Sequence, residues 1–396
     1  MDSTLISSSI GVIVVLAGIP AFFFMLEKKT QWKLFNFFPP LLFIYLLPVV
    51  FSNTNIIPNE SPVYDFMGVN LLPMFLTIML LDVDVMATIR VMGKGIFVML
   101  AGTLGVVVGA PIAFLIVKAG LGEGAWQGFG ALAGSWIGGT GNMLAVAQMI
   151  DLDDTSVNYG YAVIADNAVY LIWLPIMLGS KNMAKWFDKF TKVPKDRLEK
   201  MNRLAGELTQ DKGEMMMRHF LYLIFFGALV TALATWFSGM IPVVKTSDGI
   251  TIFSANTYKI LLVTIMGISL SFTKASKIPG SHAFSMALIY MFVARMGARA
   301  DLSNIDGSLF WFLLGAYIWI FIHGGFLLAA ARIFKVDVHT AAIASAANIG
   351  GAASAPIVAA YHNRTLVPVS ILMAMLGYAI GNPAAFLTAL LCKFVS

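Results

Sequence analysis

One carboxylate, Asp166, stands inside a long apolar stretch that reads YAVIADNAVYLIWLPI. A charged side chain within a membrane segment is costly unless it is paired, hydrated or protonated, so such residues usually mark ion or proton pathways. Asn167 follows directly and adds an amide oxygen to the carboxylate oxygens. We therefore predict that Asp166 and Asn167 hold a coupling ion, Na⁺ or H⁺. A carboxylate that only caps a neighbouring helix end remains the alternative.

Two glycine-rich stretches form a second candidate site. WIGGTGNMLAVAQ (136–148) and NIGGAASAPIVAA (348–360) share Ile-Gly-Gly and a later Val-Ala in the same register. Glycine is a poor helix former, and a broken helix leaves free N–H groups that can bind an anion and free carbonyls that can bind a cation. Close packing between helices is the alternative role for such glycines. The predicted substrate-binding residues are Gly138, Gly139, Thr140, Gly141, Asn142, Asn348, Gly350, Gly351 and Ser354.

The composition places these residues in a membrane protein. Of the 396 residues 59% are hydrophobic and 12% are charged, and the mean hydropathy is +0.82. A membrane-spanning helix needs about 20 apolar residues, and such runs recur along the chain. The first run lacks a basic region before it, so we expect a membrane span there and not a signal peptide. One cysteine, Cys392, excludes an internal disulfide framework.

Apolar segments suggest twelve membrane elements, and the charges suggest their orientation. Basic residues collect in cytoplasmic loops. If the glycine-rich segment 127–150 enters and leaves by one face, twenty of the 26 Lys and Arg residues fall on the cytoplasmic side. This arrangement puts the N-terminus outside the cell and the basic linker 181–218 inside. The twelve segments are approximately 4–26, 34–52, 66–82, 95–117, 127–150, 157–180, 219–241, 256–273, 281–297, 308–333, 337–360 and 366–393.

The glycine-rich segments divide the chain into two similar halves, 1–180 and 219–396, joined by the linker 181–218. Each half has five spans and one segment that is re-entrant or broken. Because five is odd, the second half must enter the membrane from the opposite side, which gives inverted repeats. The fold class we expect is an all-α polytopic membrane protein, in which two inverted repeats of five transmembrane helices each carry one re-entrant or broken helix.

Gly138-Gly139-Thr140-Gly141 resembles the Gly-Gly-x-Gly motif of the sodium/glutamate symporters and 2-hydroxycarboxylate transporters. The second copy, Gly350-Gly351-Ala352-Ala353, departs from that motif. Over nearly its full length the sequence resembles the YjcL-like family of uncharacterised bacterial integral membrane proteins, within the same broad superfamily. The resemblance implies a core domain that contains the broken segments, a scaffold domain, and a homodimer. Segment 366–393 contains no arginine to hold a dicarboxylate, and Arg364 lies in a loop, so a monocarboxylate, an amino acid or a small peptide fits at least as well.

These features predict a secondary active transporter in the inner or plasma membrane, which couples Na⁺ or H⁺ to symport of a small carboxylate-bearing metabolite by alternating access. A cation/proton antiporter without an organic substrate is the alternative. An intramembrane enzyme is a third possibility, but the sequence lacks paired aspartates, HExxH or a Ser/His dyad. We expect no cofactor besides the coupling ion, and no nucleic-acid partner.

Several single polar residues have simpler interpretations. Asn382-Pro383 could break the last segment and add Asn382 to the coupling-ion ligands. Lys259 and His323 have no polar partners nearby in sequence, so we expect interior packing or snorkelling of the long side chain. Arg295 and Arg299 lie at an outer helix end, where interfacial anchoring is the default and attraction of anions is the alternative.

Overall fold

The structure is a computed structural model that describes residues 4–32, 34–37, 40–81, 83, 92–153, 155–194, 213–245, 251–300, 306–363 and 366–396. Apart from a short pair of antiparallel strands, β1 (Val244–Lys245) and β2 (Thr251–Phe253), the regular structure in this part of the chain is helical. Seven of the described helical stretches are long and apolar enough to cross a membrane. The protein is therefore a polytopic helical membrane protein, as the composition predicts. Part of the predicted linker 181–218, residues 195–212, lies outside the described residues.

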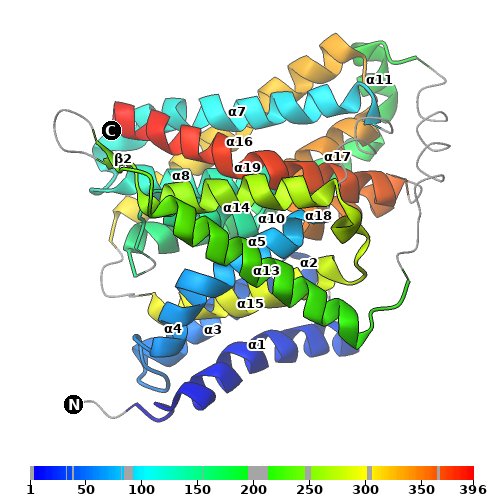
Figure 1. The fold of residues 1–396 in the computed structure, drawn as a ribbon. Coiled ribbons are helices and arrows are strands. Elements are labelled where there is room, and N and C mark those ends of the chain that lie inside the picture. The colour runs from blue at the N-terminus through cyan, green and yellow to red at the C-terminus, as the bar shows by residue number, and fades with distance from the viewer. Residues whose placement is uncertain are drawn as a thin grey trace.

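One group of helices contains both glycine-rich segments, and we call it the hairpin group. Its helices α7 and α16 pack along each other, and α19 packs on α8 (Figure 1). Small residues allow the close approach of α7 and α16, because a methyl group at Gly105 would lie 2.8 Å from Cβ of Phe326. The hairpin group comprises α7 (Gly95–Val117), α8 (Ala125–Gly138), α9 (Thr140–Met149), α10 (Val157–Gly179), α16 (Ser308–Phe334), α17 (Val338–Ile349), α18 (Gly351–His362) and α19 (Val367–Val395).

The remaining long helices form the flanking group, in which α15 packs on α3 and α5, and α13 packs on α5 and α14. It comprises α1 (Ser9–Thr30), α2 (Leu34–Phe37), α3 (Pro40–Asn53), α4 (Pro62–Phe66), the π-helical turn η1 (Met67–Leu71), α5 (Leu72–Leu80), α13 (Met217–Ser238), α14 (Ala255–Ser271) and α15 (Ser281–Arg299). Short elements connect the groups: η2 (Lys118–Gly120), η3 (Ser180–Met183), α11 (Ala184–Thr191) and η4 (Lys274–Lys277).

The first glycine-rich segment folds as a helical hairpin, α8–α9, that turns at Gly139. This residue has φ +92°, a backbone conformation that a residue with a side chain rarely adopts. At the open end, Nε2 of Gln127 donates to the carbonyl oxygen of Ile150 at 3.0 Å. Both ends of the hairpin therefore lie on the same side of the molecule.

The second segment also forms a hairpin, α17–α18, which turns at Gly350 and Gly351. Gly351 has φ +56°. At the open end, Nδ1 of His339 lies 3.0 Å from Nδ1 of His362. This end adjoins α11, since the amide of Val338 donates to Asp188, whereas the open end of α8–α9 adjoins the start of α14, where Asn256 donates to Asp151. The two hairpins thus enter from opposite ends of the molecule.

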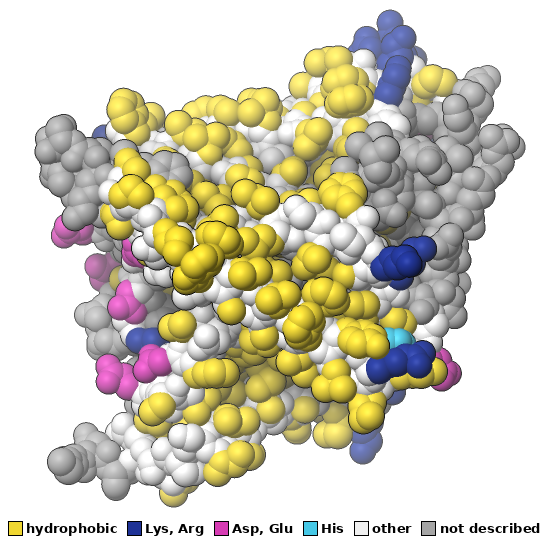
Figure 2. Space-filling view, in the orientation of Figure 1, with side chains coloured by type: hydrophobic (Ala, Val, Ile, Leu, Met, Phe, Trp, Pro, Cys, Tyr) yellow, Lys and Arg dark blue, Asp and Glu magenta, His cyan; other side chains and the backbone are white. Residues whose placement is uncertain are grey.

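Charge separates the same two ends. The N- and C-termini lie at the end that carries β2, and α11 lies at the other end (Figure 1). Figure 2 shows Asp and Glu side chains gathered near the termini and most visible Lys and Arg side chains at the opposite end. Exposed Asp65 and Asp151 belong to the first end and exposed Lys185 and Lys189 to the second.

The last helix, α19, differs from the prediction that Asn382-Pro383 breaks the last segment. Helix α19 continues through Asn382 and Pro383 to Val395, so the predicted break is absent. Buried Asn382 instead donates through Nδ2 to Oγ1 of Thr264 in α14, at 2.8 Å. A proline within a helix removes one backbone hydrogen bond and is tolerated in membranes where neighbouring groups compensate. Asn382 therefore joins the hairpin group to the flanking group.

The first hairpin packs closely against the backbone of α19, and this packing leads to a prediction about stability. A methyl group at Gly138 would lie 2.6 Å from the carbonyl oxygen of Gly377, so Gly138→Ala should destabilise the fold by about 1–3 kcal/mol through overpacking. Gly325→Ala is the matched control, because no atom lies within 4 Å of a methyl group there. Thermal unfolding in detergent should show a lower Tm for Gly138→Ala alone. Equal Tm values for the two variants would contradict the close packing at this tip.

Candidate functional site

A cavity of about 310 Å³ lies between the two helix groups, at the level where both hairpins turn. The hairpin group contributes both glycine turns and polar side chains of α10. The flanking group contributes Met79 of α5, Tyr290 of α15 and Glu27 from the last turn of α1. Because α1 ends on the side of the molecule that carries α11, the cavity extends toward that side (Figure 1). It is large enough for a small organic solute.

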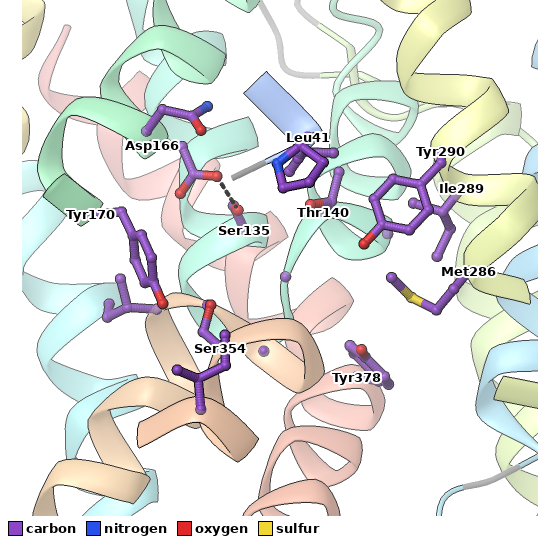
Figure 3. A pocket seen from close by; sticks show the side chains of 18 of the residues that line it. Leu41, Ser135, Thr140, Asp166, Tyr170, Met286, Ile289, Tyr290, Ser354 and Tyr378 are labelled. Atoms are coloured by element: carbon purple, nitrogen blue, oxygen red, sulfur yellow. Dashed lines mark hydrogen bonds between the residues drawn. The ribbon is translucent and has the colours of Figure 1, made fainter. Parts of the chain in front are cut away.

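Asp166 of α10 is held against the first hairpin by two donors. Oγ of Ser135 donates to one carboxylate oxygen at 2.9 Å, and Nε1 of Trp136 donates to the other at 3.0 Å. Figure 3 shows the Ser135–Asp166 bond at the wall of the cavity. A carboxylate with both oxygens fixed beside an open cavity can accept a proton or bind a cation.

The two hairpin tips touch beside this carboxylate. A methyl group built on Gly351 would lie 3.4 Å from Cα of Gly139, so only backbone separates the turns. Helices α9 and α18 both begin there, and neither has a side-chain cap at its first residue. The first N–H groups of a helix have no partner within the helix and carry its positive dipole end. Two helix N-termini therefore present donors suited to an anionic group.

The opposite wall is aromatic and apolar. Tyr290, Met286 and Ile289 of α15 lie across the cavity from Asp166 and Tyr170, and Tyr378 closes another side (Figure 3). Among the described residues that line the cavity there is no lysine or arginine. An anion bound in this cavity would therefore depend on the helix N-termini for its positive partner.

The structure brings eight of the predicted site residues to this cavity and leaves four behind its wall. Gly138 and the buried residues Asn142, Asn348 and Asn382 do not line it. The eight that do are Gly139, Thr140, Gly141, Asp166, Asn167, Gly350, Gly351 and Ser354.

Asn142 and Asn348 attach the hairpins to long helices. Nδ2 of Asn142 donates to the carbonyl oxygens of Gly377 and Tyr378 in α19, both at 3.2 Å. Asn348 donates to the carbonyl oxygen of Met99 in α7 at 3.0 Å and accepts from Thr103 of the same helix at 3.3 Å. Both amides therefore position the tips in this structure and do not face the cavity.

Among the lining residues that the sequence analysis did not identify, four have ionisable side chains: Tyr170, Tyr290, Tyr378 and Glu27. Tyr170 is one helical turn after Asp166, so helical periodicity applied to Asp166 would have found it. Tyr290, Tyr378 and Glu27 come from distant segments of ordinary composition, and nothing in their sequence surroundings indicates a site. Ser135, which directly precedes the first glycine-rich stretch (136–148), donates to Asp166 directly.

A bound cation would use oxygen atoms near Asp166. The carboxylate, the Ser135 hydroxyl and the carbonyls at the end of α8 are the hard ligands that Na⁺ prefers. Among the described residues, no group of three His, Cys, Asp or Glu side chains is placed to hold a metal ion. The arrangement offers one carboxylate with neutral oxygens around it.

The cavity predicts different thiol accessibility for two threonines. In a Cys392→Ala background, which has no cysteine, Thr140→Cys should react with a small methanethiosulfonate reagent at least about tenfold faster than Thr103→Cys, since reactivity follows exposure. Thr140 lines the cavity, whereas Thr103 is buried in α7 against Asn348. Labelling rates measured by mass spectrometry in vesicles would test this. Comparable rates, or access to Thr140→Cys only from the side of the termini, would contradict the described cavity.

Comparison with known proteins identifies a relative and a family that match most of the chain. The uncharacterized membrane protein YjcL of Bacillus subtilis (strain 168) is 25% identical over 339 residues, which are 84% of this chain and 85% of YjcL. This similarity confirms the resemblance to the YjcL-like membrane proteins. Residues 14–396 match the family described as "Protein of unknown function (DUF819)", and the chain belongs to this family of membrane proteins.

Proposed function

We propose that this protein is a secondary active transporter, in which Na⁺ or H⁺ drives symport of a small carboxylate-bearing solute by alternating access. One observation carries the proposal: two helical hairpins enter from opposite ends, and their uncapped helix N-termini meet beside Asp166 in one cavity. Broken helices that meet at a central site between repeats are typical of secondary transporters.

The order of the elements supports inverted repeats. The first half supplies three apolar segments to the flanking group (α1, α3 and α4–α5), and then α7, a hairpin and α10 to the hairpin group. The second half follows the same order with α13, α14 and α15, and then α16, a hairpin and α19. Hairpins that open at opposite ends are what an inverted pair of repeats requires. In this proposal both hairpins are re-entrant, the hairpin group is the moving core, and the flanking group is the scaffold.

The contacts between core and scaffold support one particular state of the cycle. Toward the termini, Nε2 of Gln148 in α9 donates to the carbonyl oxygen of Gly68 at 2.7 Å, and Asn256 of α14 donates to Asp151 at 3.1 Å. The cavity extends toward the opposite, basic end. Since basic ends of membrane proteins face the cytoplasm, we assign the described state as open to the cytoplasm, with the N-terminus outside the cell.

The residues that line the central cavity support the proposal of a solute with one carboxylate and few other charges. The helix N-termini at Gly139 and Gly350 supply N–H donors for a carboxylate. The cavity volume of about 310 Å³ suits an amino acid, a hydroxy acid or a very short peptide better than a larger metabolite. Tyrosine hydroxyls of Tyr170, Tyr290 and Tyr378 supply polar contacts for the rest of the molecule.

Coupling would act through Asp166, because its charge changes when a cation arrives. A carboxylate next to two anion-binding helix ends disfavours a second anion until a proton or Na⁺ neutralises it. Binding of the cation and of the solute would then favour each other, as symport requires. Ser135 and Trp136 keep the carboxylate at the first tip during this exchange.

Replacement of Asp166 tests the coupling. Proteoliposomes with an imposed Na⁺ or H⁺ gradient should accumulate a labelled solute from a panel of amino acids, hydroxy acids and short peptides. Asp166→Asn should reduce gradient-driven uptake by about tenfold or more, within the range of typical coupling free energies. The fold should persist, because an asparagine can still accept from Trp136 and donate to Ser135. Unchanged uptake with unchanged cation dependence would contradict the assignment.

Asp306→Asn is the matched control for the loss of one carboxylate. Asp306 is exposed between α15 and α16, and hydrogen bonds from the Ser308 hydroxyl and amide lower the pKa of its carboxyl. This variant should transport like the parent. A pH change driven by the Na⁺ gradient without uptake of any solute would favour the cation/proton antiporter instead.

A further inference from the structure

A second cavity, of about 500 Å³, lies on the other side of the hairpin tip, between α9 and the flanking group. It is lined by Leu144, Ala147 and Gln148 of α9 and by residues of η1, α14 and α15. Three exposed carboxylates, Asp65, Asp151 and Asp153, form its edge, and Asp151 lies at the open end of the first hairpin, on the side of the termini. We call this second cavity the antechamber. In the proposed orientation it faces the outside of the cell.

Positive charge lies deep in the antechamber and negative charge at its edge. The side chain of Lys259 is 7% exposed, and no described residue forms a hydrogen bond or ion pair with its ammonium group. Arg295 is 4% exposed and donates through Nε to the carbonyl oxygen of Tyr64 at 2.7 Å. A mostly buried lysine side chain without a counter-charge is costly, and Lys259 lines the cavity. A lysine in this state indicates that the wall of the cavity is built to receive an anion.

Two rings separate the antechamber from the central cavity. Phe75 and Phe292 are almost completely buried, and their ring centroids lie 5.7 Å apart at an interplanar angle of 72°. Along α5, Phe75 stands between Leu72 of the antechamber and Met79 of the central cavity, about one helical turn from each. Along α15, Phe292 borders the antechamber and stands between Arg295 of the antechamber and Ile289 of the central cavity. We call these two residues the aromatic gate.

Arg295 connects the antechamber to the aromatic gate. Its guanidinium carbon lies 4.8 Å from the ring centroid of Phe292, within the range of a cation–π contact. Gly68 in the π-helical turn allows this placement, because a methyl group there would lie 2.9 Å from Nη2 of Arg295. Single π-helical turns are frequent at functional sites. An anion that draws the guanidinium away from Phe292 would weaken the contact that holds this ring.

We infer that the antechamber is a second, external binding site, in which Lys259 receives the carboxylate of a small solute before the aromatic gate opens to the central cavity. This inference deepens the proposed symport and depends on it only for the onward step of the solute. Electrostatic attraction into a narrow pocket raises the local concentration of an anion. The central cavity needs no such charge, since the helix N-termini receive the solute there.

Charge-selective labelling tests the antechamber without any transport. A cysteine at Ala147, in the Cys392→Ala background, would lie in its wall. We expect the negatively charged reagent sulfonatoethyl methanethiosulfonate to react about tenfold faster than the positively charged trimethylammonium-ethyl reagent, after each rate is normalised to that with a free thiol. Lys259→Met should abolish this preference. Lys274→Met, which removes an exposed lysine of η4, should leave it unchanged.

Two results would overturn the inference. If the parent protein shows no preference for the negative reagent, the antechamber does not attract anions, whether or not Lys259→Met folds. If Lys259→Met folds, as judged by size-exclusion chromatography, and keeps the preference, another group is responsible. The labelling preference is measured without transport. The anion site in the antechamber can therefore be supported even if the protein transports no solute, and it can be contradicted even if the protein is a transporter.

Protection by a carboxylate identifies the occupant. Sodium acetate should slow labelling of the Ala147→Cys protein more than sodium chloride at the same ionic strength, and Lys259→Met should remove the difference. Vesicles of phosphatidylcholine with and without phosphatidylglycerol distinguish a lipid headgroup from a solute. Protection by phosphatidylglycerol and not by acetate would overturn the assignment to a small carboxylate.

Discussion

The unpaired backbone groups at the two hairpin turns are the constraint on which the rest of this structure depends. Lipid cannot hydrogen-bond a free N–H or carbonyl, so a helix can end inside a membrane only where protein or a water-filled cavity surrounds the end. The chain meets this requirement by packing the tips at Gly139 and Gly351 against each other and by opening one cavity beside them. The proposed solute site uses these same groups, because the groups that lipid cannot satisfy are groups that a polar solute can satisfy.

The packing differs in kind on the two sides of the cavity. Within the hairpin group, the two tips touch backbone to backbone, and Asn142 and Asn348 donate to carbonyl oxygens of α19 and α7. Toward the flanking group, the tip at Gly141 meets the side chains of Met79 and Ile289. Methionine is flexible and adapts to shifted neighbours. For the proposed alternating access, movement of the hairpin group along this adaptable surface is therefore a simpler account than rearrangement of the tips themselves.

Much of the architecture could be predicted from sequence, because membrane helices are fixed by long apolar runs and breaks in them are fixed by glycine. Each of the twelve predicted segments coincides with helical structure among the described residues, and Gly139 and Gly351 adopt positive φ. The orientation of single polar side chains could not be predicted. Asn142 and Thr140 are two residues apart, yet only Thr140 lines the cavity, since α9 turns the amide toward α19. The prediction of a helix break at Asn382-Pro383 was wrong, because a proline in a packed membrane helix need not break the helix.

The distribution of charge between the two cavities suits the proposed transport, in which the protein must also release the solute that it binds. A lysine in the central cavity would hold a carboxylate equally well in every state, and uniform binding energy of that kind slows release. Helix N-termini carry only partial charges, and the charge of Asp166 opposes an anion once the coupling ion has left. Lys259 stands outside the aromatic gate, where it can raise the local concentration of a carboxylate without retaining it in the central cavity. In this proposal, the full positive charge of Lys259 attracts the carboxylate into the antechamber. The partial charges of the helix N-termini then hold it in the central cavity weakly enough for release on the other side.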